Sequence, residues 1–451
     1  MRKLLIYNWT HIDDKQGGGV NLYVRNIIQE LISQGEYDIY YLNAGRTYTK
    51  KGSSQIIEVD TPFGQKLQAF EIINSPFIAP VRQNGKNINY YLTDKSVASL
   101  FDDFIIDHGI SVIHFNNIEG LPLEVLRIKQ RLPGIKVIYS AHNYFTLCSR
   151  TNLWQDGELK EGHNCNKKDY TECDNCYRQS IYSATILSRV YPPLKHLDKL
   201  SRYTHVHSDP ILFRRFHKET VSVINSQVDV VLAVSDRMRE LLINGGISSG
   251  LIRTSYIGTR VADKQLSYCR TDSTDIFRVA YMGYMQKEKG FYFFLNALEH
   301  MDINIAKNIE IHIIARYKTN SNKNEISRIN ELKKKFYNVI LINGYTRDNQ
   351  EKLLENINLG VIPVLWEDSL PQVAIEQMAY GVPILTSDLG GAWELHRNEH
   401  FVYSAGDYDD FEHKLKDIYY NRELLNDFWT HAMRLVDMQE HIRELRGYYE
   451  Q

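Results

Sequence analysis

Two carboxylates, Asp368 and Glu376, flank the start of a predicted helix. Ser369 and Gln372 have the spacing of a capping box and Pro371 suits a first helical turn, so we predict that the helix begins at Ser369. Asp368 then lies just before the helix and Glu376 about two turns into it. Such carboxylates do not touch, but both can face one extended ligand, and a carboxylate can bind both hydroxyls of a ribose. The alternative is that Asp368 compensates the helix dipole and Glu376 is solvated.

Three glycine-rich turns could bind phosphate groups. Gly17-Gly18-Gly19 lies between a predicted strand and a predicted helix, where free backbone amides can donate to an anion. The segment Gly283–Gly290 also follows a predicted strand, and its Lys289 could place a compact positive charge on a diphosphate. Gly390-Gly391 precedes a further predicted helix and could form an anion-binding nest. Each glycine segment is also compatible with a plain turn, and Lys289 with a solvated side chain.

Four of the five cysteines lie in one short stretch with the spacing C-x16-C-x7-C-x2-C: Cys148, Cys165, Cys173 and Cys176. A Cys-x2-Cys pair commonly binds tetrahedral Zn²⁺, and His163 is a further potential ligand. Disulfides are not expected in a reducing cytoplasm. The spacing therefore leaves structural zinc and free thiols as alternatives. A catalytic zinc is disfavoured, because four cysteine ligands leave no open coordination position.

The elements that must position these residues are short apolar runs alternating with helical patterns. The predicted strands are Leu4–Tyr7, Tyr37–Leu42, Val112–Phe115, Val137–Ser140, Val230–Val234, Arg278–Met282, Ile309–Ala315, Val339–Ile342, Leu359–Pro363 and Ile384–Thr386. The predicted helices include those after Gly17-Gly18-Gly19, around Leu123–Leu132, and over Asp236–Asn244 and Phe291–His300. This alternation predicts parallel sheets with helices on both faces.

We therefore predict an α/β protein with two doubly wound, Rossmann-like domains. The first is expected to span residues 1–262 with a cysteine-rich insertion at about 148–220, and the second residues 276–430. The polar stretch 263–275 is the predicted linker, and 431–451 is expected to be a helix that packs back towards the first domain. Because ligands of such folds bind beyond the carboxyl ends of the strands, the predicted site is the cleft between the two domains.

Composition narrows the classes of function. The chain has 451 residues with 53 Lys+Arg against 55 Asp+Glu, a balance that argues against a general nucleic-acid binder. It contains no apolar run of ~18–20 residues, and the apolar run after Met1 is too short for a secretory signal, so we expect a cytoplasmic protein. Charge is uneven, however, because residues 178–218 hold eight basic and two acidic residues. That segment is either a solvated helical face or a contact for an anionic membrane or a pyrophosphate-linked acceptor.

Taken in order, these motifs resemble those of the retaining, nucleotide-sugar-dependent glycosyltransferases of the GT-B fold, family four. The most specific part is the pair of carboxylates eight positions apart, followed by Met378-Ala379-x-Gly381-x-Pro383 and Gly390-Gly391-x-x-Glu394. Further matches in order are Gly18-Gly19, His114-x-Asn116, Ala141-His142, Val234-Ser235 and Lys289-Gly290. Members with a role in polysaccharide assembly often carry a cysteine-rich excursion after the histidine, and the one in this chain looks similar.

The resemblance implies a role for each candidate in the second domain. Glu376 should hold the nucleotide ribose, Asp368 should lie near the transferred sugar, and Lys289 should neutralise the leaving diphosphate. Asp368 stands where the family usually has Glu, which keeps the charge and shortens the reach. Leu370 and Pro371, which follow it, belong to the same donor-binding segment.

In the first domain the resemblance points to the early glycines and to one histidine. Gly18 and Gly19 should close the phosphate side of the donor site, and His142 should face the sugar and the acceptor. Taken alone, His142 could equally be a hydrogen-bonded histidine of the core.

The chain departs from the family at Tyr284. The family commonly has Arg directly after the equivalent of Gly283, as a second clamp on the diphosphate. A tyrosine hydroxyl can donate one hydrogen bond but carries no charge, and a lost charge-assisted contact would weaken leaving-group stabilisation by a few kcal/mol. Either another cation, such as Arg260 or Arg316, takes its place, or the enzyme is slow.

The expected function is transfer of a sugar from a nucleotide-diphosphate sugar to a hydroxyl of a glycan or lipid-linked acceptor. The resemblance implies retention of configuration, the hexosyltransferase class EC 2.4, a role in surface polysaccharide biosynthesis and no catalytic metal. The expected location is the cytoplasm, and the alternative that the basic segment 178–218 raises is peripheral contact with the inner face of the cytoplasmic membrane. The alternatives are a GT-B sugar phosphorylase or nucleotide-sugar epimerase, a non-catalytic glycan-binding protein of the same fold, and a zinc-dependent interaction module at 148–220.

Overall fold

The computed structural model describes most of the chain. The described residues are 1–14, 18–49, 52–77, 79, 85–148, 150–155, 162–165, 170, 173, 210–265 and 276–450. Gly17, Cys176 and most of the basic segment 178–218 lie outside the described residues.

The first domain is built on an eight-stranded sheet with the order β10-β9-β6-β5-β1-β2-β4-β3. All neighbours are parallel except the edge pair β3 and β4. The strands are β1 Arg2–Tyr7, β2 Tyr37–Ala44, β3 Gln55–Glu58, β4 Gln68–Ile73, β5 Val112–Phe115, β6 Lys136–Ala141, β9 Val230–Ala233 and β10 Ile252–Thr254. A separate two-stranded hairpin joins β7 Trp154–Gln155 to β8 His163–Asn164.

The second domain is built on a six-stranded, entirely parallel sheet with the order β13-β12-β11-β14-β15-β16. Its strands are β11 Phe277–Gly283, β12 Ile309–Ala315, β13 Asn338–Ile342, β14 Leu359–Ile362, β15 Ile384–Ser387 and β16 Val402–Tyr403. β5, β9, β14 and β15 are buried along their whole length, as expected for parallel sheets covered on both faces.

Helices cover both sheets. The helices that precede the second sheet along the chain are α1 Gly18–Gln34, α2 Gly85–Thr93, α3 Ser96–His108, α4 Ile128–Arg131, α8 Pro210–Gln227, α9 Asp236–Asn244 and α10 Ala262–Gln265, with 3₁₀ turns η1 Gly64–Lys66 and η2 Leu123–Arg127. The helices that follow β11, the first strand of the second sheet, are α11 Phe291–His300, α12 Ile303–Ala306, α13 Lys323–Leu332, α14 Arg347–Leu354, α15 Gln372–Ala379, α16 Tyr408–Tyr420, α17 Glu423–His431 and α18 Met438–Glu450, with 3₁₀ turns η4 Trp393–Leu395 and η5 Glu399–Phe401.

The ten predicted strands and the α/β class are confirmed, and the structure has two Rossmann-like domains. The sequence missed the strands β3, β4, β7, β8, β10 and β16. The helix predicted around Leu123–Leu132 is a 3₁₀ turn, η2, followed by the single α turn of α4. Pro122 stands at the N-cap of η2 in an extended conformation. The helix predicted after Gly390-Gly391 is only the 3₁₀ turn η4.

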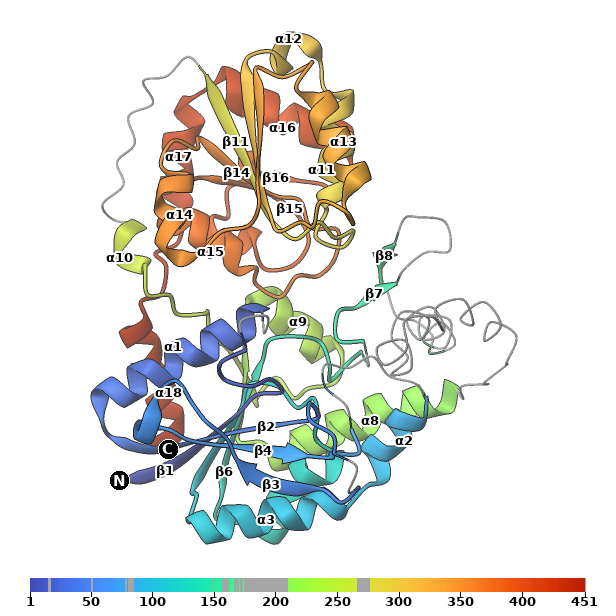
Figure 1. Ribbon diagram of the computed structural model, residues 1–451, viewed down its shortest axis with the longest axis vertical. Helices are drawn as coiled ribbons and strands as arrows, with labels where there is room; N and C mark the ends of the chain where they lie inside the picture. Colours follow the sequence, from blue (N-terminus) through green and yellow to red (C-terminus); the bar gives the residue numbers. More distant parts are fainter. Residues whose placement is uncertain are drawn as a thin grey trace.

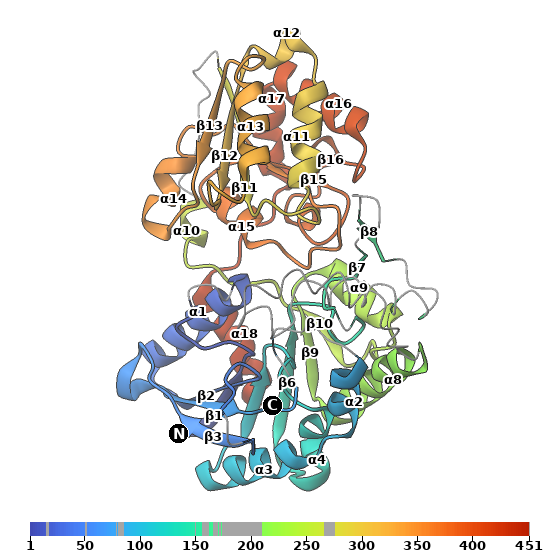
Figure 2. The same cartoon turned by 45° about the vertical axis from the view of Figure 1, so that its right-hand side comes forward.

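The two domains are stacked along the long axis of the molecule (Figures 1 and 2). α1 and α9 of the first domain and α15 of the second lie near the junction in both views. The last helix, α18, crosses back and packs beside α1 and β6 of the first domain. Its end is fixed to the start of the chain, where Arg2 donates to the Tyr449 carbonyl at 2.7 Å. Of the helices within the described ranges, none is both long and apolar enough to cross a bilayer.

Candidate active site at the domain junction

The loop between β14 and α15 carries an ion pair. Lys289 Nζ lies 2.5 Å from Asp368 Oδ2 and stands over the Trp366 ring, 4.9 Å from its centroid. Asp368 is only 5% exposed, so this carboxylate holds the ammonium group in one place at the edge of the second domain. The structure thus brings together two residues that are 79 positions apart in the sequence.

The helix predicted to begin at Ser369 begins later, and that prediction was wrong. α15 starts at Gln372, Pro371 occupies the N-cap without a side-chain cap, and Ser369 turns away from the helix. Its hydroxyl donates to the His142 carbonyl at 2.8 Å, and its carbonyl accepts from Ser235 Oγ at 2.6 Å. Both partners belong to the first domain, so contacts across the junction replaced the expected capping box. Because the N-cap residue Pro371 offers no side-chain acceptor to the first amides of α15, this helix start favours an anion.

The starts of α1 and α15 meet across the junction. α1 begins at Gly18, and the Gln372 side chain donates to the Gly19 carbonyl at 2.7 Å. A Cβ atom on Gly19 would lie 3.2 Å from the Gln372 side chain, so even alanine there would require that side chain to shift slightly. Because the N-terminal end of a helix carries partial positive charge, two such ends side by side favour a negatively charged group between them.

Glu376 lies one turn further along α15 than Gln372. Its carboxylate accepts a hydrogen bond from Tyr345 Oη at 2.9 Å. Burial raises the pKa of Glu376, while the hydrogen bond from Tyr345 and the nearby Arg347 act in the opposite direction. The side chain is half-buried and therefore still reachable by a ligand.

Arg347, at the start of α14, is a cation that the sequence analysis did not single out. Its Nη2 donates to Asn26 Oδ1 of α1 at 3.0 Å, so it bridges the two domains beside Glu376. Burial lowers its pKa, and the charges of Arg260 and Arg25 lower it further. No local pattern marks this residue, because its partners come from other elements.

Glu367 joins the domains through Arg237 of α9. Arg237 Nε and Nη2 lie 3.0 and 2.6 Å from the two carboxylate oxygens, and the Gly390 amide donates to the same carboxylate at 3.0 Å. Gly390 has φ +69°, and a Cβ atom there would lie 2.2 Å from the Asp368 carbonyl oxygen. The Gly390-Gly391 turn therefore packs directly on the loop that carries both carboxylates, which requires glycine.

Glu394 forms a second connection. It is 1% exposed, and its oxygens accept hydrogen bonds from the Asp236 and Arg237 amides at 2.8 and 2.6 Å and from Tyr256 Oη at 2.8 Å. A carboxylate of the second domain thus caps α9 of the first. Burial raises the pKa of Glu394 although these bonds favour its charged form.

His142 follows β6 at the same junction. Its ring is stacked at a tilt on Tyr23, with 4.6 Å between the ring centroids. Burial, with a further contribution from His441, lowers the pKa of His142 to about 3, so the ring is neutral at physiological pH. In the part of the chain that the structure describes, His142 Nε2 has no hydrogen-bond partner although it is buried.

Comparison with known proteins then identifies the architecture. Residues 276–421 match the family model of the group 1 glycosyl transferases. Sucrose-phosphate synthase from Thermosynechococcus elongatus is similar over 100% of this chain and 99% of its own, with a TM-score of 0.61 and 13% identity. The present chain has a GT-B fold.

Two further structures share the GT-B fold with it. Anabaena HepE, solved in complex with UDP, is similar over 100% of this chain and 100% of its own, with a TM-score of 0.59 and 12% identity. A glycosyltransferase from Rickettsia africae has the same TM-score and identity and covers 100% of this chain and 98% of its own. A sequence search of curated proteins finds no match.

Tyr284, at which the chain departs from the family pattern, directly follows β11. Tyr284 is 53% exposed, and its carbonyl accepts from Tyr281 Oη at 2.6 Å. Of the two arginines considered as its replacement, Arg260 pairs with Glu30 of α1 at 3.6 Å, and Arg316 is exposed after β12. Leu370 and Pro371 are both buried between Asp368 and α15.

Three of the five cysteines lie within the described residues. Cys148 is buried in the core of the first domain, whereas Cys165 and Cys173 are partly exposed and pack at its edge. Among the residues with described positions, no group of three or more His, Cys, Asp or Glu side chains could hold a metal ion. Because Cys176 is outside that set, zinc binding stays a prediction from the spacing.

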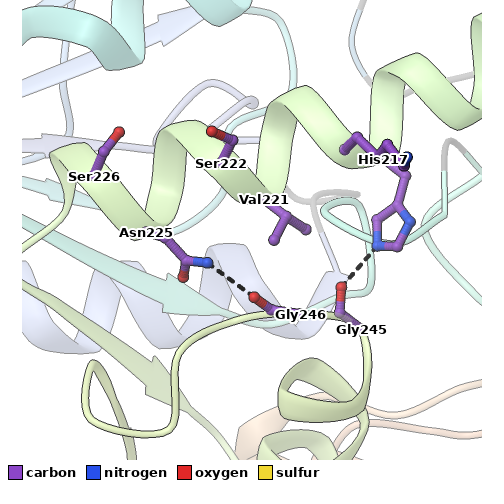
Figure 3. A pocket seen from close by; sticks show the side chains of 8 residues that line it. His217, Val221, Ser222, Asn225, Ser226, Gly245 and Gly246 are labelled. Carbon is purple, nitrogen blue, oxygen red and sulfur yellow. Dashed lines mark hydrogen bonds between the residues drawn. The ribbon is translucent and has the colours of Figure 1, made fainter.

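Two open pockets belong to the first domain alone. One, of about 500 Å³, lies between α8 and the turn at Gly245-Gly246, where His217 Nε2 and Asn225 Nδ2 contact the two glycine carbonyls at 2.9 and 2.8 Å (Figure 3). The other, of about 430 Å³, is lined by Arg2, Glu36, Tyr37 and Glu450. Neither is lined by a residue of the candidate site.

Proposed function

We propose that this protein is a glycosyltransferase that uses a nucleotide-diphosphate sugar as donor. The observation that carries the proposal is the convergence of two helix starts, the Lys289–Asp368 ion pair and Glu376 at one junction. A nucleotide sugar has a matching order of groups: a ribose for the carboxylate, a diphosphate for the helix starts and the lysine, and a sugar beyond. HepE was solved with UDP and with UDP-glucose, which makes a uridine nucleotide the first donor to test.

In the proposed reaction, the bond between the anomeric carbon and the diphosphate breaks as an acceptor hydroxyl forms the new glycosidic bond. Positive charge develops on the sugar and negative charge on the departing phosphate oxygen, which takes the proton of the acceptor hydroxyl. Lys289 and the amides at the start of α15 stabilise that oxygen. We propose attack from the face that the phosphate leaves, so that configuration is retained. Asp368 lies beside the sugar, and His142 faces the sugar and the acceptor.

The proposed acceptor is a hydroxyl of a glycan or lipid-linked oligosaccharide in surface polysaccharide biosynthesis. Contact with the inner face of the membrane belongs to the same proposal. Of the basic segment 178–218, the start of α8 is described, and there Ile211, Arg214 and Lys218 are exposed. An exposed apolar side chain beside cations suits an anionic bilayer. Sedimentation with anionic liposomes should be lost in the double variant Arg214→Glu, Lys218→Glu, and equal sedimentation of this variant would refute the contact.

Donor binding is tested by thermal unfolding with UDP, GDP, CMP and their sugar conjugates. A ligand at 100 times its Kd adds about 2.7 kcal/mol to stability, which raises Tm by about 5–10 °C for a domain of this size. We expect one nucleotide series to raise the Tm of the wild type and to have little effect on Glu376→Ala.

Glu325→Ala is the matched control for that experiment. Glu325 also accepts a tyrosine hydrogen bond, from Tyr292 at 2.8 Å, but it belongs to α13 rather than to the junction. The control should respond to the nucleotide as the wild type does. If Glu376→Ala shows the same Tm shift as the wild type, the Glu376 carboxylate is not part of the donor site. If no nucleotide shifts the Tm of the wild type, the proposed donor class is wrong.

A further inference from the structure

The last helix of the chain, α18, places a buried histidine in the first domain, close to the candidate site. His441 of α18 is 1% exposed, and its Nε2 lies 2.7 Å from Tyr23 Oη of α1. A Cβ atom on Gly258 would lie 2.6 Å from His441 Cβ, so the chain between the domains closes directly over this residue. A segment more than 400 residues away in sequence therefore fixes the hydroxyl of Tyr23.

Tyr23 stands between His441 and His142. Its ring centroid is 5.5 Å from that of His441 and 4.6 Å from that of His142, with interplanar angles near 60° in both cases. Tyr23 lies four residues after Gly19, and residues at this spacing share one face of a helix. The face of α1 that meets α15 at the junction is thus the face that supports the His142 ring.

The His142 backbone and ring are held by different domains. The carbonyl accepts from Ser369 of the second domain, whereas the ring rests on Tyr23 of the first. Its Nε2 is buried, and no described group forms a hydrogen bond to it. Buried polar atoms are nearly always paired, so an unpaired ring nitrogen at a domain junction points to a bound group that completes it.

We propose that Tyr23 and His441 are positioning residues that hold the His142 ring so that Nε2 faces the sugar and acceptor. The inference rests on the proposed function and deepens it, because it gives α18 a part in the site that its place in the sequence does not suggest. The hydroxyl of Tyr23, anchored on His441, fixes the plane of the tyrosine ring, and that plane sets the tilt of His142.

The same helix offers a matched control. Tyr449 Oη lies 2.8 Å from His114 Nδ1, and His114 Nε2 lies 2.7 Å from Ser140 Oγ. This is also a buried tyrosine–histidine hydrogen bond between α18 and the sheet, but its tyrosine has no ring contact with His142 among the described residues. Tyr449→Phe therefore loses a comparable hydrogen bond but keeps the Tyr23 side chain, its bond to His441 and its ring contact with His142.

The test compares Tyr23→Phe, Tyr23→Leu, His441→Ala and Tyr449→Phe with the wild type. The histidine ring signals of ¹³C-labelled protein report the His142 environment without any substrate. We expect the His142 signals to shift in the first three variants and to be unchanged in Tyr449→Phe, where the signals of His114 change instead because it loses its bond to Tyr449. With the nucleotide sugar selected by the thermal panel, kcat should fall about 10-fold in Tyr23→Leu and several-fold in Tyr23→Phe, with donor KM within about twofold.

His142→Ala separates this inference from the proposed function. If His142→Ala keeps the wild-type kcat, the role proposed for His142 is wrong. If His142→Ala is impaired while Tyr23→Phe and Tyr23→Leu keep the wild-type kcat and His142 signals, the positioning role alone is overturned. An equal loss of kcat in Tyr449→Phe would also overturn it, because general loosening of α18 would then explain the effect. Tyr23→Phe is the mildest change and keeps the test valid if the larger ones fail to fold.

Discussion

Replacing Lys289 by methionine is expected to lower kcat by about 10²–10³-fold, the usual effect of removing one preorganised group that stabilises developing negative charge. The methionine keeps most of the length of the side chain and its contact with Trp366, but the ammonium group beside Asp368 is lost. Because Tyr284 carries no charge, this lysine supplies a larger share of the stabilisation than it would beside an arginine. Donor-dependent release of nucleoside diphosphate measures the effect.

Lys287→Met is the matched control for Lys289→Met. This variant removes a lysine from the same loop after β11. Among the described residues Asp368 pairs with Lys289, so this ion pair stays in place in Lys287→Met. We expect Lys287→Met to keep kcat within about threefold. A Lys289→Met enzyme with wild-type kcat would show that the diphosphate leaves without help from this cation. The arginine beside Glu376, Arg347, would then be the next candidate.

The second large effect is expected at the connection between Glu367 and Arg237. Glu367 is 3% exposed, and its loss leaves Arg237 and the Gly390 amide without their shared acceptor. Removal of one partner from a buried pair costs about 3–5 kcal/mol, and we expect about 1–3 here because the Arg237 side chain is 30% exposed. Glu367→Ala should therefore favour separation of the domains, lowering kcat and raising uncoupled hydrolysis of the donor.

A double-mutant cycle distinguishes that connection from a general loss of stability. Arg237→Leu together with Glu367→Leu should cost clearly less than the two single changes added together. Arg397 and Asp236 form an exposed pair across the same junction at 3.1 Å, and Arg397→Ala should change stability by less than about 1 kcal/mol. Additive effects at Glu367 and Arg237, or an equally large effect of Arg397→Ala, would contradict the assignment.

The sequence predicted the elements better than the contacts between them. Strands such as Ile309–Ala315 are marked by their own apolar residues, so both domains were predictable. Ser369 shows why the loop before α15 was not. Its pattern fits a capping box, but the hydrogen-bond partners that decide its conformation, His142 and Ser235, are more than 130 positions away.

The residues of the candidate site also differ in whether the sequence could identify them. Asp368, Glu376 and Lys289 could be selected from the sequence because their motifs are local. Arg347 and His441 could not, because each acts through a residue of α1 from the far end of the chain. A lone arginine at a helix start or a lone histidine within a helix carries no pattern that distinguishes it from a surface or core residue.

The central claim, sugar transfer from a nucleotide-diphosphate sugar, is tested most directly by the release of nucleoside diphosphate with and without a glycan acceptor. We predict release that increases with acceptor in the wild type and in Glu325→Ala, and that is lost in both Glu376→Ala and Lys289→Ala. Release that continues unchanged in these two site variants, or a wild type that binds the nucleotide sugar and never releases the diphosphate with any acceptor, would contradict the account.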